Sequence, residues 1–577
     1  MRNILFLAIF CYACAPSPTK DGFHADQSDV KVGVPTDVRT LARHAADTFR
    51  LSLDKGMLVY GNADQRTVDV MVEVFNPRKQ KVGSYDSPAR GPEQFWLKTD
   101  TAGVFKVVVS PYEENTGEYT LLVAGAEPIA TTPDGVAQQF IRSFMGTEPR
   151  MPGASVAVMN AGKITFSKGY GYADLESDRL ITPATIFHVA SVSKQFTAFA
   201  IATLADQGKL SLDDDIRKYL PELHDFGYTI TINHLAHHTS GLRDQWNLLM
   251  MAGWRLDDVI TQEQIMRVIA RQHDLNFKPG EQFLYCNTGF TLMAEIVKRV
   301  TGQTLAEWTA ANVFQPLGMK NTLFYDDHEK IVPNRAYSYY KFGRTGEYKK
   351  SVLSYANDGA TSLFTTPEDL CTWARNFKTM KVGNANVMAM MQKPFILNNG
   401  DTTDYAMGVA IDKWRGIRQI SHGGADAGYR SYLAYFPDED IAIAVASNYA
   451  QFGPGGLAYA EAELLLADKL QPSKSNVIPP PPPAKKDSID YKSIRLGDYT
   501  GDFYSDELDT HYWFDVKNDT LVAHHQRHDD AKLAIKGKDQ FSMRFMGDVA
   551  FTRNKSGVID GFKASNGRVL NLVFVKR

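Results

Sequence analysis

The chain has 577 residues, of which 44% are hydrophobic and 22% charged, a length that accommodates about three folded units. Its 63 basic and 66 acidic side chains give a formal net charge of −3, without a long block of one sign, so nothing indicates a nucleic-acid partner. Four cysteines are too few for a disulfide framework and are not spaced as zinc ligands.

Residues 1–20 have the pattern of a secretory signal peptide. A short basic start precedes an apolar run at 4–10, which is too short to span a membrane stably. Two modes of cleavage stay open. Residues 13–15 fit an ordinary signal peptidase except that Pro16 follows, whereas cleavage before Cys14, with lipid added to that cysteine, avoids the proline. We therefore expect an exported protein, either a periplasmic or outer-membrane lipoprotein lipidated at Cys14 or a freely secreted one.

Residues 32–126 show the two-residue apolar period of β-strands. Valines stand at every second position from Val68 to Val74, apolar runs occur at 107–109 and 119–122, and turn residues lie between them. This spacing predicts a small β-sandwich. The segment resembles the pre-peptidase sandwich found in many secreted bacterial hydrolases, and it carries no catalytic motif.

Residues 132–471 mix strands and helices. A hairpin pattern turns at Asn160–Gly162, helical spacing follows in segments such as 196–207, and strand-like runs return at 429–448 before a final helix. Strands at both ends with helices between predict an α+β domain, with an antiparallel sheet that both termini complete. Its two cysteines, Cys286 and Cys371, are expected to be buried free thiols.

A Pro-rich linker at 472–490 predicts a semi-rigid spacer. Residues 491–577 are again β-like, with a hairpin turn at 517–519, and resemble the lipocalin-like β-barrel. The expected fold is therefore multidomain, with the α+β domain between an N-terminal β-sandwich and a C-terminal β-barrel. Three histidines of the last segment are expected on a solvated strand face: His524, His525 and His528.

Ser191 and Lys194 form the first candidate catalytic pair. Ser191 follows an extended apolar stretch and opens a long helical pattern rich in Ala, Phe and Leu. A serine at a helix start lies at the positive end of the helix dipole, and a lysine three residues on shares its helical face. A buried lysine loses solvation and can accept the serine proton. Because other Ser-x-x-Lys matches in this chain arise by chance, a capping serine beside a solvated lysine is the alternative.

Tyr285 and Asn287 form the second candidate pair, on a loop that follows a Pro-Gly turn and leads into a helix. Two residues of this spacing on a loop can aim both side chains at one cleft. Tyr285 is a candidate base for Ser191 and a later acid for the leaving group, and Asn287 is a candidate ligand for the substrate's carbonyl. The alternative is a turn asparagine beside a core tyrosine.

The third candidate element is His422-Gly423-Gly424-Ala425, just before the strand-rich end of the domain. Glycines at a strand edge let another backbone approach closely, so a substrate peptide can lie alongside. The amide of Ala425 and that of Ser191 would then form an oxyanion hole. The alternative is a glycine turn with an incidental surface histidine. The pair His237-His238 is interpreted as structural and Asp213–Asp215 as a charged loop, so no metal site is expected.

In this order and spacing the three elements resemble the penicillin-binding and serine β-lactamase fold, in particular the branch of class C β-lactamases, D-aminopeptidases and esterases. Further matches are "GKLSLDDDIRKYLPEL", "ITINHLAHHTSGL" and "GATSLFTTPEDLCTWA", and the resemblance covers about residues 135–470. It implies that Ser191 is acylated, that Lys194 and Tyr285 move protons, and that Asn287 and His422 position the substrate.

One departure bears on the substrate. True β-lactamases and carboxypeptidases usually carry Lys-Thr-Gly as third element, where this chain has His422-Gly423-Gly424. A mostly neutral histidine weakens recognition of a substrate carboxylate. We therefore expect an exported serine hydrolase, without a metal or organic cofactor, that cleaves a small peptide, amide or ester, including cell-wall fragments.

The alternatives are a penicillin-binding or sensing module that acylates without efficient turnover, and a β-lactamase proper. Membrane contact is expected only through the lipid on Cys14. The role of the two flanking β units stays open: they can shape the cleft, bind a wall polymer or space the enzyme from a membrane.

Overall fold

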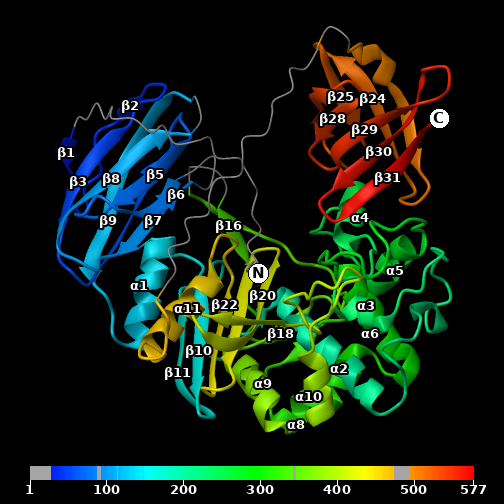
Figure 1. Cartoon of the computed structure of the whole chain (residues 1–577), viewed down its shortest axis with the longest axis horizontal. Coiled ribbons are helices and arrows are strands. Elements are labelled where there is room, and N and C mark those ends of the chain that lie inside the picture. The colour runs from blue at the N-terminus through cyan, green and yellow to red at the C-terminus, as the bar shows by residue number, and fades with distance from the viewer. Residues whose placement is uncertain are drawn as a thin grey trace.

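The computed structural model describes residues 27–86, 92–112, 115–146, 148–341, 346–472, 491 and 494–577. The predicted signal peptide with Cys14 and nearly all of the Pro-rich linker lie outside these residues. Figure 1 shows two β units at opposite ends of a larger mixed domain. The multidomain fold class is therefore confirmed. No helix in the described part of the chain combines the length and the hydropathy needed to cross a bilayer.

The N-terminal unit consists of two sheets that share one core. The first sheet has the order β1 (Gln27–Asp29), β3 (Asp47–Leu53), β8 (Gly103–Pro111), β5 (Val70–Phe75) and β6 (Lys81–Tyr85). The second has the order β2 (Arg39–Leu41), β9 (Gly117–Pro128), β4 (Met57–Asp64) and β7 (Pro92–Lys98). Alternate residues such as Val72 and Val123 point into the shared core, which is why the sequence shows a two-residue period.

The central domain is built on a six-stranded antiparallel sheet that both ends of the domain complete. Its order is β11 (Lys163–Tyr170), β10 (Ala154–Asn160), β22 (Ile441–Ser447), β21 (Tyr429–Phe436), β20 (Ile417–Asp426) and β19 (Ala410–Trp414). β22 is buried at every position because both faces of the sheet are covered.

Helices cover the two faces of this sheet differently. Val445 and its neighbours on one face share a core with α1 (Pro133–Met145) and α11 (Pro454–Leu465). Ala444 on the other face belongs to the large core that holds the remaining helices. These are α2 (Lys194–Asp206), α3 (Ile232–Ala236), α4 (Gln245–Met251), α5 (Gln262–Ala270), α6 (Asn287–Thr301), α7 (Leu305–Thr309), α8 (Gln315–Leu317), α9 (Pro367–Thr379) and α10 (Ala385–Met391).

Three small sheets lie beside the main one. The first pairs β14 (Phe187–His188) and β15 (Leu323–Phe324) with β18 (Leu363–Thr365), and β14 leads directly to Ser191. The other two are hairpins: β12 (Tyr172–Asp174) with β13 (Arg179–Leu180), and β16 (Tyr339–Lys341) with β17 (Tyr348–Lys350).

The C-terminal unit is a nine-stranded, nearly closed barrel. Its order is β26 (Ala531–Lys532), β25 (Thr520–His524), β24 (Thr510–Lys517), β23 (Gly501–Ser505), β31 (Val569–Lys576), β30 (Ile559–Asn566), β29 (Gly547–Arg553), β28 (Gln540–Met543) and β27 (Ala534–Gly537). Phenylalanines such as Phe503 and Phe562 fill its interior. Leu248 and Met251 of α4 belong to the same core, so the barrel packs directly on the central domain (Figure 1).

The predicted solvated face for the three barrel histidines is wrong. His524 and His525 are each 6% exposed. His524 lies between the carboxylates of Asp515 and Asp530, and His525 packs against Gly253 of the central domain. His528 hydrogen-bonds to the carbonyl of Met250. His525 and His528 are covered because this part of the barrel faces the central domain, whereas His524 is buried within the barrel itself. Cys286 and Cys371 are buried free thiols, as predicted.

Candidate active site

Ser191 lies in a tight 3₁₀ turn, Ala190–Ser193, that runs straight into α2. Ala190 has a φ of 48°, a left-handed conformation that costs a residue with a Cβ about 1 kcal/mol. Ser193 stabilises the turn, because its hydroxyl donates to the carbonyl of Ala190 at 2.5 Å and accepts from the amide of Leu363 at 3.0 Å. The turn therefore holds Ser191 at the N-terminal end of a buried helix.

Lys194 is fully buried beside Ser191. Its ammonium nitrogen lies 3.1 Å from the Ser191 hydroxyl, 2.8 Å from Oδ1 of Asn287 and 2.7 Å from the carbonyl of Ala360. Burial lowers the pKa of Lys194 to about 7; Asp244 opposes this shift and Arg568 adds to it. A substantial fraction of Lys194 is therefore an uncharged amine near neutrality, and that amine can accept the proton of Ser191.

Tyr285 lies on the loop before α6, with its ring centre 4.9 Å from the Lys194 nitrogen. Burial raises the pKa of Tyr285 above its usual range, although its hydrogen bond with Ser191 and the charge of Arg568 oppose the shift. The phenol is therefore neutral at pH 7. This favours proton donation by Tyr285 to a leaving group, and leaves Lys194 as the group better suited to take the proton of Ser191.

Asn287 connects Lys194 to a buried carboxylate that sequence reasoning missed. Oδ2 of Asp244 accepts from the backbone N–H of Asn287 at 2.7 Å and from its side-chain amide at 2.8 Å. This leaves Oδ1 of Asn287 directed at Lys194. In the structure Asn287 thus orients Lys194, while its predicted contact with the substrate's carbonyl stays a prediction. Asp244 follows the "HHTSGL" segment and caps α4, which is the only local signal it carries.

His238 packs against the ring of Tyr285. Its ring centre lies 4.1 Å from that of Tyr285, and its Nδ1 accepts from the backbone N–H of Cys286 at 3.1 Å. The preceding His237 bonds to the carbonyls of Asn233 and Lys393. The structural interpretation of this histidine pair thus agrees with the observed contacts, and His238 positions a candidate catalytic side chain.

The third predicted element lies on β20, beside the turn that carries Ser191. Nε2 of His422 lies 2.9 Å from the hydroxyl of Tyr405, and Nδ1 lies 2.6 Å from the carbonyl of Gly423. Burial lowers the pKa of His422 to about 3, and the charge of Lys194 acts in the same direction. A neutral His422 offers no positive charge to a substrate carboxylate.

Packing within the chain requires a glycine at the position of Gly424. A Cβ there would lie 2.2 Å from the carbonyl oxygen of Val189 and 2.3 Å from the hydroxyl of Ser431. Sequence reasoning assigned this close approach to a substrate backbone, whereas the structure shows that the approaching backbone is the stretch just before Ser191. This contact places β20, and with it the predicted oxyanion donor Ala425, next to the turn that carries Ser191.

The barrel contributes Arg568 to the site. Arg568 lies in the turn between β30 and β31, and its guanidinium lies 3.3 Å from Oδ2 of Asp244 and 5.1 Å from the ring centre of Tyr285. Its carbonyl accepts from the backbone N–H of Asp244 at 3.2 Å and from the side chain of Asn276 at 2.9 Å. Asn276 also accepts from the amide of Leu570. The hairpin is therefore held against the loops that carry Asp244 and Asn276.

A second contact joins the barrel to the same loops. Arg243, next to Asp244, forms an ion pair of 2.6 Å with Glu507 of the barrel, and both side chains are almost fully buried. Among the roles that sequence reasoning left open for the barrel, the structure shows that it shapes the site. No sequence signal pointed to Arg568, since only the packing of two domains brings it to Tyr285.

The site has the features of the penicillin-recognising serine class. These are a serine with a lysine three residues on, a tyrosine on a facing loop, and a strand that carries glycines. The sequence profile of the Beta-lactamase family matches residues 137–468, and the chain belongs to this family.

Curated relatives include two D-aminopeptidases. The one from Gluconobacter oxydans (strain 621H) is 28% identical over 298 residues, which cover 52% of this chain and 56% of the relative. The one from Brucella anthropi is 26% identical over 316 residues, which cover 54% and 59%. The chain thus spans little more than half the length of these relatives.

Solved structures with a similar fold include two penicillin-binding proteins. The octameric homologue from Pyrococcus abyssi superimposes with a TM-score of 0.51 at 22% identity, over 77% of this chain and 99% of the other. The protein from Bacillus halodurans gives a TM-score of 0.51 at 23% identity, over 58% and 100%. At these identities the likeness concerns the fold alone.

Proposed function

We propose that this protein is a serine hydrolase that forms an acyl-enzyme at Ser191 and cleaves a small amide. The observation that carries the proposal is the buried Lys194, whose nitrogen lies 3.1 Å from the Ser191 hydroxyl and whose pKa is lowered to about 7. A lysine in that state is matched to removing a proton from serine at neutral pH.

In the proposed reaction Ser191 Oγ attacks the substrate's carbonyl carbon while Lys194 takes the hydroxyl proton. The negative charge on the carbonyl oxygen is stabilised by the backbone amides of Ser191 and Ala425. Tyr285 donates its proton to the leaving amine as the C–N bond breaks, and Lys194 then gives Tyr285 the proton that it took from Ser191. Water then attacks the acyl-enzyme, with the same groups moving the protons in reverse order.

The D-aminopeptidase relatives support an amide bond next to a D-configured residue as the substrate class. A free amine or an uncharged amide fits this site better than a substrate carboxylate, because His422 is neutral. Peptidase, D-amino-acid amidase and esterase activities share the same acyl-enzyme. We also propose that the protein is exported, on the basis of its first 20 residues.

The neutral His422 bears on the two alternatives as well. A β-lactamase proper is disfavoured, since the third element offers no cation to the carboxylate of a penicillin. A penicillin-binding or sensing module would form the same acyl-enzyme but hydrolyse it slowly. Such a module would release one equivalent of product per chain, whereas the hydrolase would release product over many turnovers.

The test combines labelling with turnover. Intact-protein mass spectrometry after exposure to a fluorophosphonate should show one adduct on the parent protein and none on Ser191→Ala. D-alanine p-nitroanilide should then release p-nitroaniline over many turnovers, faster than its L counterpart. Equal labelling of parent and variant would remove Ser191 from its role, and one equivalent of product without turnover would favour the sensing module.

A further inference from the structure

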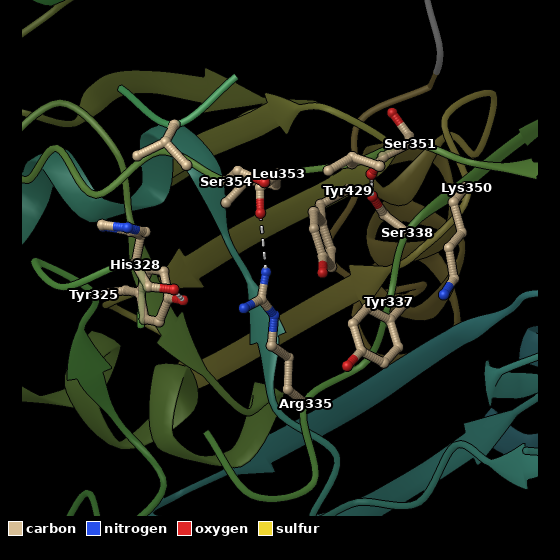
Figure 2. Close-up of a pocket in the computed structure, with 12 residues that line it drawn as sticks. Tyr325, His328, Arg335, Tyr337, Ser338, Lys350, Ser351, Leu353, Ser354 and Tyr429 are labelled. Atoms are coloured by element: carbon tan, nitrogen blue, oxygen red, sulfur yellow. Dashed lines mark hydrogen bonds between the residues drawn. The ribbon is translucent and has the colours of Figure 1, made fainter. Parts of the chain in front are cut away.

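A pocket of about 330 Å³ lies outside the site at Ser191, between the β16–β17 hairpin and the loops on either side of it. Figure 2 shows Arg335 at its centre, with Tyr325 and His328 on one side and Tyr337 and Lys350 on the other. Of the residues that the structure describes, no aspartate or glutamate lines it, although three tyrosines and three serines do. The lining is therefore basic and rich in hydroxyl groups.

Arg335 is stacked among aromatic rings without an acidic partner. Its guanidinium carbon lies 4.7 Å from the ring centre of Phe364 and 5.2 Å from that of Tyr325. Among the described residues it forms no ion pair, its Nε is buried without a hydrogen-bond partner, and Nη2 makes one long bond of 3.4 Å to the carbonyl of Leu353. Burial lowers the pKa of Arg335, but the neighbouring hydroxyls of Tyr429 and Tyr325 raise it overall. A bound anion would add the full counter-charge that these neutral groups do not supply.

Neighbouring groups do not supply that anion. The hydroxyls of Tyr325 and Tyr429 give their protons to the carbonyls of His328 and Ala336 and offer Arg335 only neutral lone pairs. Asp426, the nearest carboxylate on β20, accepts from Thr361 at 2.7 Å. Lys350 forms an ion pair with the exposed Glu176 and lies 4.9 Å from the ring centre of Tyr337. Glu176 and Asp174 thus already offset the charge of Lys350, whereas Arg335 is the lining cation without an acidic partner among the described residues.

The pocket is separated from the nucleophile by one layer of side chains. The ring of His188 lies 5.5 Å from that of Tyr429, which lines the pocket, and 5.2 Å from that of Phe364, on which Arg335 stacks. On its other side His188 accepts from the backbone N–H of Ala190, next to Ser191. None of the candidate catalytic residues lines the pocket.

We propose that this pocket is a second ligand site that binds a small organic carboxylate. Arg335 and Lys350 would pair with the carboxylate, the serine hydroxyls would donate to it, and the flat or apolar body of the ligand would lie against the tyrosine rings. The proposal does not depend on the proposed hydrolase activity, since it involves none of the residues that would carry that activity.

Calorimetric titration tests this site on the full chain carrying Ser191→Ala, which removes any turnover. The probes are benzoate, the neutral benzamide and inorganic phosphate. We expect benzoate to bind with one site per chain, benzamide to bind at least about tenfold more weakly, and phosphate to bind more weakly than benzoate. Equal affinities for benzoate and benzamide would overturn the proposal, and a tighter site for phosphate would assign the pocket to phosphate compounds instead.

Variants locate the binding. Arg335→Gln should weaken benzoate binding about tenfold or more, and Lys350→Gln about threefold. Lys349→Gln removes the same charge from the adjacent residue of β17 and should leave the affinity unchanged. Urea unfolding shows whether Arg335→Gln folds. If it does not, the test is the difference in benzoate affinity between Lys350→Gln and Lys349→Gln. Benzoate affinity unaffected by both Arg335→Gln and Lys350→Gln, or no benzoate binding at millimolar concentration, contradicts the proposal.

Discussion

The guanidinium of Arg568 lies 3.3 Å from the carboxylate of Asp244, although 324 residues separate them in the chain. Asp244 in turn holds the amide of Asn287, whose oxygen accepts from Lys194. A residue of the C-terminal barrel is therefore linked to Lys194 through two hydrogen-bonded side chains. The pKa of Lys194 reflects both charges, since Asp244 raises it and Arg568 lowers it.

The first prediction concerns the pH dependence of acylation. With the pKa of Lys194 near 7, its amine form dominates above pH 7 and its ammonium below. We expect kcat/KM to rise through about pH 7, and to fall about tenfold per unit well below it, since the ammonium cannot accept the Ser191 proton. A pH–rate profile on D-alanine p-nitroanilide measures this. A flat profile from pH 5 to 9 would remove Lys194 as the base.

The second prediction concerns Arg568. Arg568→Met removes a positive charge near Lys194 and leaves the negative Asp244 unopposed, and both changes favour the ammonium. The acidic limb of the profile should therefore move to higher pH, and kcat/KM at pH 7 should fall about tenfold or more. Arg544→Met, an exposed arginine elsewhere on the barrel, is the matched control and should change neither quantity. An unchanged limb in Arg568→Met would show that the barrel residue does not act on Lys194.

The third prediction compares two adjacent glycines on β20. A Cβ at Gly424 would lie 2.2 Å from the carbonyl oxygen of Val189, whereas at Gly423 the nearest atom is 3.5 Å away, on Tyr432. Gly424→Ala should push β20 from the turn of Ser191 and lower fluorophosphonate labelling rates at least about a hundredfold, since acylation depends on aligned amides. Gly423→Ala should label at nearly the parent rate. Similar rates for both variants would contradict the assigned contact.

The fourth prediction concerns a carboxyl buried in α11. Glu461 is fully buried, neither carboxyl oxygen has a hydrogen-bond partner within the described residues, and burial raises its pKa to about 8. The folded chain therefore keeps a proton that the unfolded chain loses above about pH 4.5. Stability should fall between about pH 4.5 and 8, by on the order of 1 kcal/mol per pH unit from this group.

Glu461→Gln keeps the shape of the side chain and removes the titration. The variant should be more stable than the parent at pH 8, and its unfolding free energy should vary less over this range. Urea unfolding at pH 5, 6.5 and 8 measures the difference. A stability gap that does not widen with pH would mean that Glu461 is ionised in the folded chain.

The fifth prediction concerns the attachment of the barrel. Glu507→Gln leaves the buried guanidinium of Arg243 without its carboxylate, and breaking such a pair typically costs about 3–5 kcal/mol. We expect a lower free energy of unfolding in urea. We also expect a lower kcat/KM, because Arg243 is followed directly by Asp244, which holds Asn287 in the candidate site. The exposed Asp509→Asn, which removes an ion pair with Arg271, is the control and should cost less than about 1 kcal/mol. Equal effects of the two variants would argue against a special role for the buried pair.

Much of the fold could be predicted because the relevant patterns are local. The two-residue period in 47–53 and 70–74 follows from strands with one buried face, and the apolar run in α2 follows from a helix buried on all sides. The hairpin that turns at 160–162 was predicted from its turn residues and is observed in the register of β10 and β11. The prediction for His525 and His528 was wrong because their burial depends on a neighbouring domain, and that for His524 was wrong because two barrel carboxylates enclose it.

By itself the sequence determined the chemical groups of the candidate site, since Ser191 and Lys194 share a helix face wherever that helix lies, and Tyr285 and Asn287 share one loop. Only the tertiary structure decided how those groups are tuned. Burial, which no local pattern measures, lowers the pKa of Lys194 and keeps Tyr285 and His422 neutral. Asp244 and Arg568 act on Lys194 through space, because electrostatic energy depends on distance and on the surrounding medium, and not on separation along the chain.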